Sequence, residues 1–251
     1  HIECSCISMK HLGEYLDIHC GGIDNAFPHH TNEIAQSEAY TGHKWCNYWF
    51  HVHHLNTNSG KMSKSKGEFL TVSLLESKGY SPMIYRFFCL LSHYRKSLVF
   101  SYENLDNAKA AYNKLISRIA ALMPEKKGDI DKAEFERLRA GFVSAMDDDL
   151  NTSNAITALY DVVKSEADAA TKLALIEDFD KVLSLGLTEA AQRLAAADAE
   201  ELPEEIAKLA EQRKQARKAK DFALADSLRD KIVSLGYIVE ETRQGTRITK
   251  K

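Results

Sequence analysis

Residues 15–52 constrain the fold most, because they predict a strand, a helix and a second strand joined by short connections. YLDIHCGG alternates apolar and polar residues and then meets glycines, as a strand that runs into a loop does. FPHHTNEIAQSEAYTG places Pro28 where a first helical turn accepts proline, and it ends at Gly42. YWFHVHHL is aromatic and alternating, which is typical of a strand. We therefore expect a βαβ unit in a parallel sheet.

The first 97 residues differ in composition from the rest, and we interpret residues 1–97 as one domain. They hold all five cysteines, both tryptophans and all ten histidines. Within this region SPMIYRFFCLLSHY is apolar nearly all round, which predicts a buried helix.

Residues 98–190 predict an antiparallel helical bundle with short loops. Asn151 or Thr152 is a candidate cap for one of its helices. Four segments carry apolar stripes at helical spacing: ENLDNAKAAYNKLISRIAAL, KAEFERLRAGFVSAM, TSNAITALYDVVKSEA and TKLALIEDFDKVLSLG.

Residues 203–251 predict a small mixed α/β region. A basic helix begins after Pro203, and a second amphipathic helix ends at Gly236. The last segment alternates on both sides of Gln244 and Gly245, which indicates a hairpin. The basic helix carries a run of cations that is either a solvated face or a phosphate contact: Lys208, Arg213, Lys214, Arg217, Lys218 and Lys220.

The overall composition limits the class of protein. The chain has 251 residues, 44% of them hydrophobic and 27% charged, with a net charge of −3. These values are ordinary for a soluble globular protein, and they exclude a global basic field for nucleic acid. The apolar runs are too short for a membrane span. An odd number of cysteines favours free thiols or a metal site, and hence a reducing, cytoplasmic compartment.

The chain begins at His1 without an initiator methionine or a signal-peptide pattern. Its first residues already have the composition of an ordered domain. We therefore expect a fragment of a longer protein that lacks an N-terminal portion.

A first candidate site is a metal site. His29 and Glu33 are four residues apart, so a helix places them on one face, and Cys4 is a further donor that we expect on a neighbouring strand. The i+4 partner of His30 is Ile34, which cannot bind metal. Spacing does not separate Cys4 from Cys6. The same spacing also fits a packed histidine and a solvated glutamate.

Three more histidines follow at positions 51, 53 and 54. His51 and His53 share one face of the predicted strand, and His54 points to the other face. Such a pair can bind metal, but a polar pocket lining is the more common role.

A second candidate site is GKMSKSKG at residues 60–67. It interleaves Lys61 and Lys64 with small hydroxyl residues between two glycines. Such a segment is either a solvated turn or a loop that closes on a polyphosphate.

Four segments together resemble the cysteinyl-tRNA synthetases, a family of class I aminoacyl-tRNA synthetases. They are HIECS, LDIHCGGIDNAFPHHTNEIAQSEA, GKMSKSKG and ARKAKDFALADSLRDKIVSLGYIVEETRQGT. The resemblance implies a Rossmann-type α/β catalytic core with a parallel sheet, present here in part. An α-helical bundle and a small mixed α/β anticodon-binding region follow in that family.

The resemblance also implies the site residues. The family holds a catalytic zinc through two cysteines, a histidine and a glutamate, and Cys4, His29 and Glu33 match three of them. We expect one Zn²⁺ per chain, with the fourth ligand and the HIGH motif in the missing N-terminal segment. The KMSKS segment implies contacts to ATP, with Mg²⁺, from five residues, of which Lys64 and secondarily Lys61 act on the reacting phosphates: Lys61, Met62, Ser63, Lys64 and Ser65.

The implied activity is cysteine–tRNA ligase, which activates L-cysteine with ATP and transfers it to tRNA(Cys). We expect a monomer, and we expect the fragment alone to be inactive. Departures from the family pattern occur at Thr31, Cys20, Lys66 and Glu68, and Cys20 stands where glycine is usual. His1 and His19 match histidines near the family's active site without an assigned role.

Two other functions stay open. One is a cysteine ligase of thiol-cofactor biosynthesis, which forms the same adenylate but passes cysteine to an amino sugar. The other is a non-catalytic tRNA-binding module. The basic helix and terminal hairpin favour tRNA, because a small acceptor does not require them.

Overall fold

The structure is a computed structural model that describes residues 1–57, 60–61, 71–126, 128–199, 203–242 and 245–250. The chain divides into two compact units. The first consists of His1–Lys114 and Asp131–Ala167, and the second of Leu115–Ile130 and Asp168–Lys251.

The first unit contains the predicted strand–helix–strand run. Strand β1 (Leu16–Gly22) pairs in parallel with β2 (Cys46–Val52). Between them lie a 3₁₀ turn (Ile23–Asn25), a π-helical turn (Ala26–His30) and α2 (Thr31–Thr41). Helix α2 ends at Gly42 with φ of 74°, a left-handed conformation that glycine adopts without strain. The βαβ prediction is confirmed.

A second sheet of the first unit has the order β4–β3–β5. Its central strand β3 (Leu55–Thr57) pairs antiparallel with β4 (Gly60–Lys61) and in parallel with β5 (Leu98–Phe100). Helices α3 (Val72–Ser77) and α4 (Pro82–Leu90) lie between β4 and β5 in sequence. The helix predicted in SPMIYRFFCLLSHY is α4, and three of its apolar side chains are buried: Ile84, Phe87 and Phe88.

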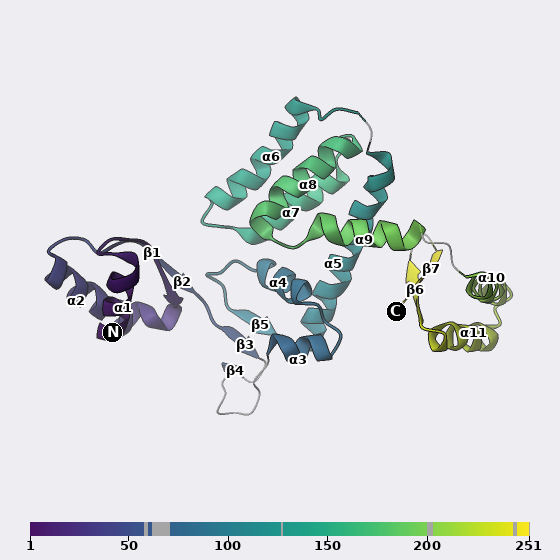
Figure 1. Ribbon diagram of the computed structural model, residues 1–251, viewed down its shortest axis with the longest axis horizontal. Coiled ribbons are helices and arrows are strands. Elements are labelled where there is room, and N and C mark those ends of the chain that lie inside the picture. The colour runs from purple at the N-terminus through teal and green to yellow at the C-terminus, as the bar shows by residue number, and fades with distance from the viewer. Residues whose placement is uncertain (58–59, 62–70, 127, 200–202, 243–244, 251) are drawn as a thin grey trace. The chain divides into compact units, whose positions relative to one another are not determined.

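The four predicted helices of the middle region are present as α5 (Tyr102–Leu122), α6 (Lys132–Asp147), α7 (Thr152–Lys164) and α8 (Ala169–Leu183), and a further helix that was not predicted, α9 (Leu187–Ala199), follows them. The stripe of α5 is buried along its length, from Leu105 to Ile119. Helix α6 packs against α7 (Figure 1). Of the two candidate caps, Asn151 is the one observed, because its side chain accepts the Asn154 N–H.

The C-terminal part of the second unit is a helical pair with a hairpin. Helices α10 (Glu204–Lys218) and α11 (Phe222–Ser234) pack together, and β6 (Tyr237–Thr242) pairs antiparallel with β7 (Gly245–Lys250). Their core is formed by four buried side chains: Ile206, Leu209, Ile232 and Val239. The hairpin prediction is confirmed, and the element order agrees with the predicted fold class.

Candidate metal centre

Three donor side chains of the first unit converge: those of Cys4, His29 and Glu33. Cys4 comes from α1 (Ile2–Leu12), His29 from the π-helical turn, and Glu33 from the first turn of α2. One ligand atom from each lies within 4.8 Å of those of the other two. The structure thus brings together the three residues that the sequence proposed as metal ligands.

Cys4 lies on a helix and not on a strand, so that part of the prediction was wrong. Segment 2–12 folds as α1 because Ser5 and Met9, four residues apart, face inward together. Ser5 is buried, and Met9 packs on the core around Leu16 and Trp45. Cys6 is two residues from Cys4, about 200° around the helix, and it lies outside the converging group.

Glu33 has an unusual environment for a carboxylate. Its side chain is fully buried, and Oε2 accepts a hydrogen bond from Nε2 of His19 at 3.1 Å. The other oxygen, Oε1, has no hydrogen-bond partner in the described part of the chain, and Nε2 of His29 lies 3.6 Å from it. A buried carboxylate oxygen without a partner is costly, and a cation at this point would satisfy it. The residues present therefore fit a zinc ion.

His29 is oriented by a second histidine. Its Nδ1 lies 2.8 Å from Nδ1 of His1, and one of these two nitrogens must carry the shared proton. This contact turns the other ring nitrogen of His29 toward Glu33. A hydrogen bond that fixes the ring and tautomer is typical of histidine ligands. Sequence reasoning had left His1 without a role.

A second group of donors shares the same carboxylate: His19, His30 and Glu33. His30 is 3% exposed, and its Nδ1 lies 2.8 Å from Nε2 of His51. Burial, and then the neighbouring His19, lower the pKa of His30. A Cβ at Gly21 would lie 2.7 Å from Cε1 of His30, so a glycine at this position makes room for the ring.

The three later histidines do not share one strand. Strand β2 ends at Val52, so the alternation predicted through His54 is not present. His51 contacts His30, whereas His54 lies 3.3 Å from Asp24. His53 lines a separate cavity of about 340 Å³, and its backbone N–H donates to the Tyr94 carbonyl. The prediction of a shared face was wrong because the strand stops one residue too early.

The GKMSKS segment is described only in part. Lys61 belongs to β4, opposite Asn56 of β3. Met62, Ser63, Lys64 and Ser65 lie outside the described residues, as does the continuation at Lys66 and Glu68. Cys20 stands within β1 opposite Phe50, so a residue other than glycine continues the strand there.

Three family models match the chain in succession. Residues 1–110 match the tRNA synthetases class I (C) catalytic domain, residues 141–197 the DALR domain, and residues 188–248 the cysteinyl-tRNA ligase anticodon binding domain. With the parallel strand pair and the site described above, these matches define a class I aminoacyl-tRNA synthetase.

Curated relatives narrow the family. The chain is 43% identical to the cysteine–tRNA ligase of Caldicellulosiruptor saccharolyticus over 265 residues, which covers 100% of this chain and 56% of the relative. It is 41% identical to that of Bacillus licheniformis, with 98% and 55% covered, and 38% identical to that of Protochlamydia amoebophila, with 100% and 54% covered. The chain belongs to the cysteine–tRNA ligase family, and it spans about half the length of these relatives. None of the helices in the described residues has the length and apolar character needed to cross a membrane.

Proposed function

We propose that the full-length protein carrying these residues is a cysteine–tRNA ligase. It activates L-cysteine with ATP, releases pyrophosphate, and transfers the cysteinyl group to tRNA(Cys). The observation that carries this proposal is the convergence of Cys4, His29 and Glu33 around a buried carboxylate oxygen, in a chain of this family.

Recognition of cysteine requires a means of rejecting serine, which differs from it by one atom. A pocket that relies on shape separates such near-isosteres by only about 100-fold. Bound zinc supplies a Lewis acid that binds a thiolate far better than a neutral hydroxyl. Cys4, His29 and Glu33 hold the ion in this proposal, with a fourth ligand outside the 251 residues. Because three donors are one fewer than the family uses, we propose that the 251 residues alone are inactive.

ATP activation requires neutralisation of polyphosphate charge. In this proposal Lys64, with Lys61, contacts the phosphates as charge moves to the leaving group, and Mg²⁺ accompanies the nucleotide. Neighbouring residues of the segment complete the ATP contact: Met62, Ser63 and Ser65. Lys61 is placed beside Asn56 by the β3–β4 pairing.

Binding of tRNA(Cys) is assigned to residues 98–190 and 203–251. The basic helix α10 offers exposed cations at Lys214 and Lys218. Arg213 is excluded from this role, because it is 5% exposed and donates to Oγ1 of Thr246 at 3.2 Å. The anticodon-binding match at residues 188–248 favours tRNA over a small amino-sugar acceptor. We propose a cytoplasmic monomer.

The test uses the full-length protein. Cysteine-dependent exchange of pyrophosphate into ATP measures activation, and charging of tRNA(Cys) measures transfer. We expect both, together with one zinc per chain by elemental analysis. Exchange without charging would favour a small-acceptor ligase, and tRNA binding without exchange would favour a non-catalytic module.

A further inference from the structure

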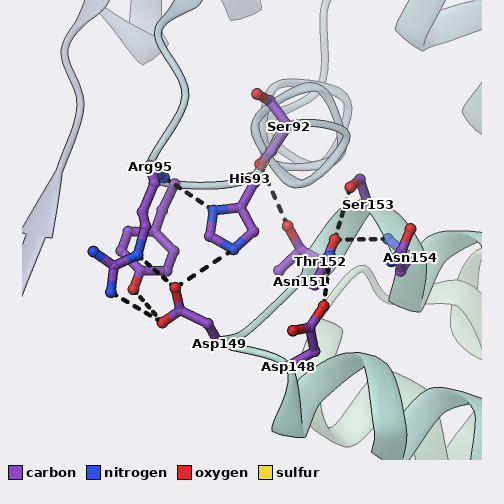
Figure 2. Close-up of polar contacts among 10 residues, drawn as sticks. Ser92, His93, Arg95, Asp148, Asp149, Asn151, Thr152, Ser153 and Asn154 are labelled. Carbon is purple, nitrogen blue, oxygen red and sulfur yellow. Dashed lines mark hydrogen bonds and ion pairs between the residues drawn. The ribbon is translucent and has the colours of Figure 1, made fainter.

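A polar cluster joins two distant segments of the first unit. Asp149 lies in the connection between α6 and α7, and Tyr94 and Arg95 lie in the connection between α4 and β5. Figure 2 shows the side chains of Arg95 and His93 directed toward Asp149. Arg95 donates from Nε to Oδ2 of Asp149 at 2.5 Å and from its terminal nitrogen to Oδ1 at 3.3 Å. The Tyr94 hydroxyl donates to the same Oδ1 at 2.5 Å. The carboxylate therefore accepts three hydrogen bonds from across the fold.

The backbone at this carboxylate is held in an uncommon conformation. Asp149 and Leu150 have φ of 53° and 54°, in the left-handed region. Aspartate tolerates this region, but leucine rarely adopts it, and each such residue costs on the order of 1–3 kcal/mol. The next residue, Asn151, caps α7, and Thr152 donates to the Ser92 carbonyl at 3.4 Å. The α6–α7 connection is thus fixed on both sides of Leu150.

The other side of the cluster leads into the three-stranded sheet. Strand β5 begins three residues after Arg95 and pairs with β3. The Asn56 amide donates to Oγ of Ser97 at 2.6 Å, and Asn56 is also the partner of Lys61 in β4. Just before β3, the backbone N–H of His53 donates to the Tyr94 carbonyl at 2.9 Å. Strand β3 and the residues just before it are therefore hydrogen-bonded to the segment that holds Arg95.

Aromatic contacts reinforce the same segment. The rings of Phe50 and Tyr94 stack with centroids 4.1 Å apart, and the Arg95 guanidinium lies 5.2 Å from the centre of the Tyr94 ring. The His93 ring also stacks on the Tyr94 ring, with centroids 4.8 Å apart, and its Nε2 lies 3.9 Å from Oδ2 of Asp149. Phe50 belongs to β2, so the cluster also reaches the strand that precedes β3.

Stability alone does not account for this arrangement. The side chains of Arg95 and Asp149 are 63% and 46% exposed, and an exposed ion pair contributes little to the free energy of unfolding. A bidentate contact across elements instead adds geometric specificity. What it fixes here is the position of the α4–β5 connection relative to the α6–α7 connection.

We propose that Arg95 and Asp149 are positioning residues for amino-acid activation. This clamp, defined as Arg95, Tyr94 and Asp149, holds β5 and β3 in register and so sets the position of β4, whose Lys61 begins the KMSKS segment. The proposal rests on the proposed ATP-dependent activation. Neither residue contacts the substrate in this proposal.

The experiment compares variants of the full-length protein. Asp149→Asn keeps the size and the tolerance for left-handed φ but removes the charge. It should lower kcat of pyrophosphate exchange by roughly tenfold or more, as small misplacements of reacting groups do. The KM for cysteine and the zinc content should not change. Arg95→Ala should act alike, Arg95→Lys should recover part of the rate, and the double variant should be no slower than the slower single variant.

Arg137→Ala is the matched control. Arg137 donates twice to Glu134, at 2.7 and 2.6 Å, but both residues lie on α6. Its removal should leave kcat unchanged. If the clamp variants lower only the thermal midpoint, or impair tRNA charging with exchange intact, the positioning role is refuted.

Amide hydrogen exchange gives a readout that does not depend on activity. Asp149→Asn should speed exchange in residues 53–57 and 98–100, whereas Arg137→Ala should not. Absence of cysteine-dependent exchange in the wild type would refute the proposed function. Amide exchange would still test whether the clamp holds β3 and β5, because unchanged exchange rates in these strands would refute it.

Discussion

Nε2 of His19 lies 3.1 Å from Oε2 of Glu33, and this contact leaves Oε1 to face His29. The same carboxylate therefore faces His19 and His29 through different oxygens. The oxygen on the His29 side is the one without a hydrogen bond among the described residues. This asymmetry favours the side of Cys4 and His29 for the proposed metal ion.

Replacement of His29 should remove zinc from the full-length protein. His30 cannot substitute, because it lies about 100° further around the helical turn and contacts His51. In His29→Ala, we expect bound zinc to fall and activation of cysteine to fall with it, while activation of serine changes little. Elemental analysis and pyrophosphate exchange with each amino acid measure these quantities.

His11→Ala is the control for this change, since His11 is exposed on α1 and lies outside both donor groups. Full zinc content and an intact preference for cysteine in His29→Ala would show that the ligand assignment is wrong.

Cys4 and Cys6 allow a second test with one chemical change. Both are exposed thiols on α1, but only Cys4 reaches the donor group. Cys4→Ser replaces a thiolate donor by a neutral hydroxyl and should release zinc, whereas Cys6→Ser should retain it. Equal zinc content in the two variants would contradict the assignment of Cys4 as the ligand.

Lys64→Ala should slow activation without weakening cysteine binding. A charged contact that develops in the transition state contributes about 2.7–4 kcal/mol to barrier lowering, so kcat of pyrophosphate exchange should fall by roughly a hundredfold or more. Lys181→Ala, which removes an exposed lysine paired with Asp178 on α8, is the control. Normal turnover with only a raised KM for cysteine would contradict the assigned role.

Local patterns accounted for much of the fold and of the site. The period of residues 31–41 and the glycine at position 42 predicted α2, whose first turn carries Glu33. His29 precedes that helix, in the π-helical turn, and still faces Glu33 as the four-residue spacing predicted. Apolar stripes likewise predicted α5 to α8. These features depend on neighbours within a few residues, which a sequence displays directly.

Features that depend on distant contacts were missed. Cys4 was expected on a strand, because nothing local shows that Ser5 and Met9 face the same core. Arg213 was counted with the phosphate-binding cations, because its contact with Thr246 joins residues 33 apart in sequence. The clamp of Arg95 and Asp149 joins residues 54 apart. Tertiary packing decides such contacts.

Tyr85 should give the protein a distinct alkaline transition. Burial, with a smaller contribution from Cys89, raises the pKa of Tyr85 to about 12. The unfolded chain then loses this proton near pH 10, before the folded protein does. Because the folded state binds the proton more tightly, its contribution to stability is complete below pH 10 and is lost as pH rises toward about 12.

Tyr85→Phe should therefore flatten the fall in unfolding free energy over this alkaline range. The tyrosinate absorbance of the variant should lack one late-titrating group out of the ten tyrosines. Tyr15→Phe, at an exposed tyrosine, is the control and should keep the late titration. An identical late titration in Tyr85→Phe would contradict the assignment.

Arg213 and Lys218 lie on one basic helix, but they should have different functions. Arg213 is buried, and its guanidinium donates to Oγ1 of Thr246 of β7. Arg213→Ala removes that bond and the packing of its stem, so it should destabilise α10, α11 and the hairpin by roughly 1–3 kcal/mol. Hydrogen exchange of residues 237–242 in the full-length protein measures this loss.

Lys218 lies exposed in the last turn of the same helix. If α10 contacts the tRNA backbone, Lys218→Ala should weaken tRNA binding and reduce the salt dependence by about one counterion, with hairpin protection unchanged. Arg213→Ala should show the opposite pattern. The hairpin should lose its protection from amide exchange, and the molecules that remain folded should keep the salt dependence of tRNA binding. Lys208→Ala, which removes the partner of Glu204 at the other end of α10, tests how far along the helix the contact extends. A reduced salt slope in Arg213→Ala with full hairpin protection would show that the buried guanidinium reaches phosphate, and would overturn its structural assignment.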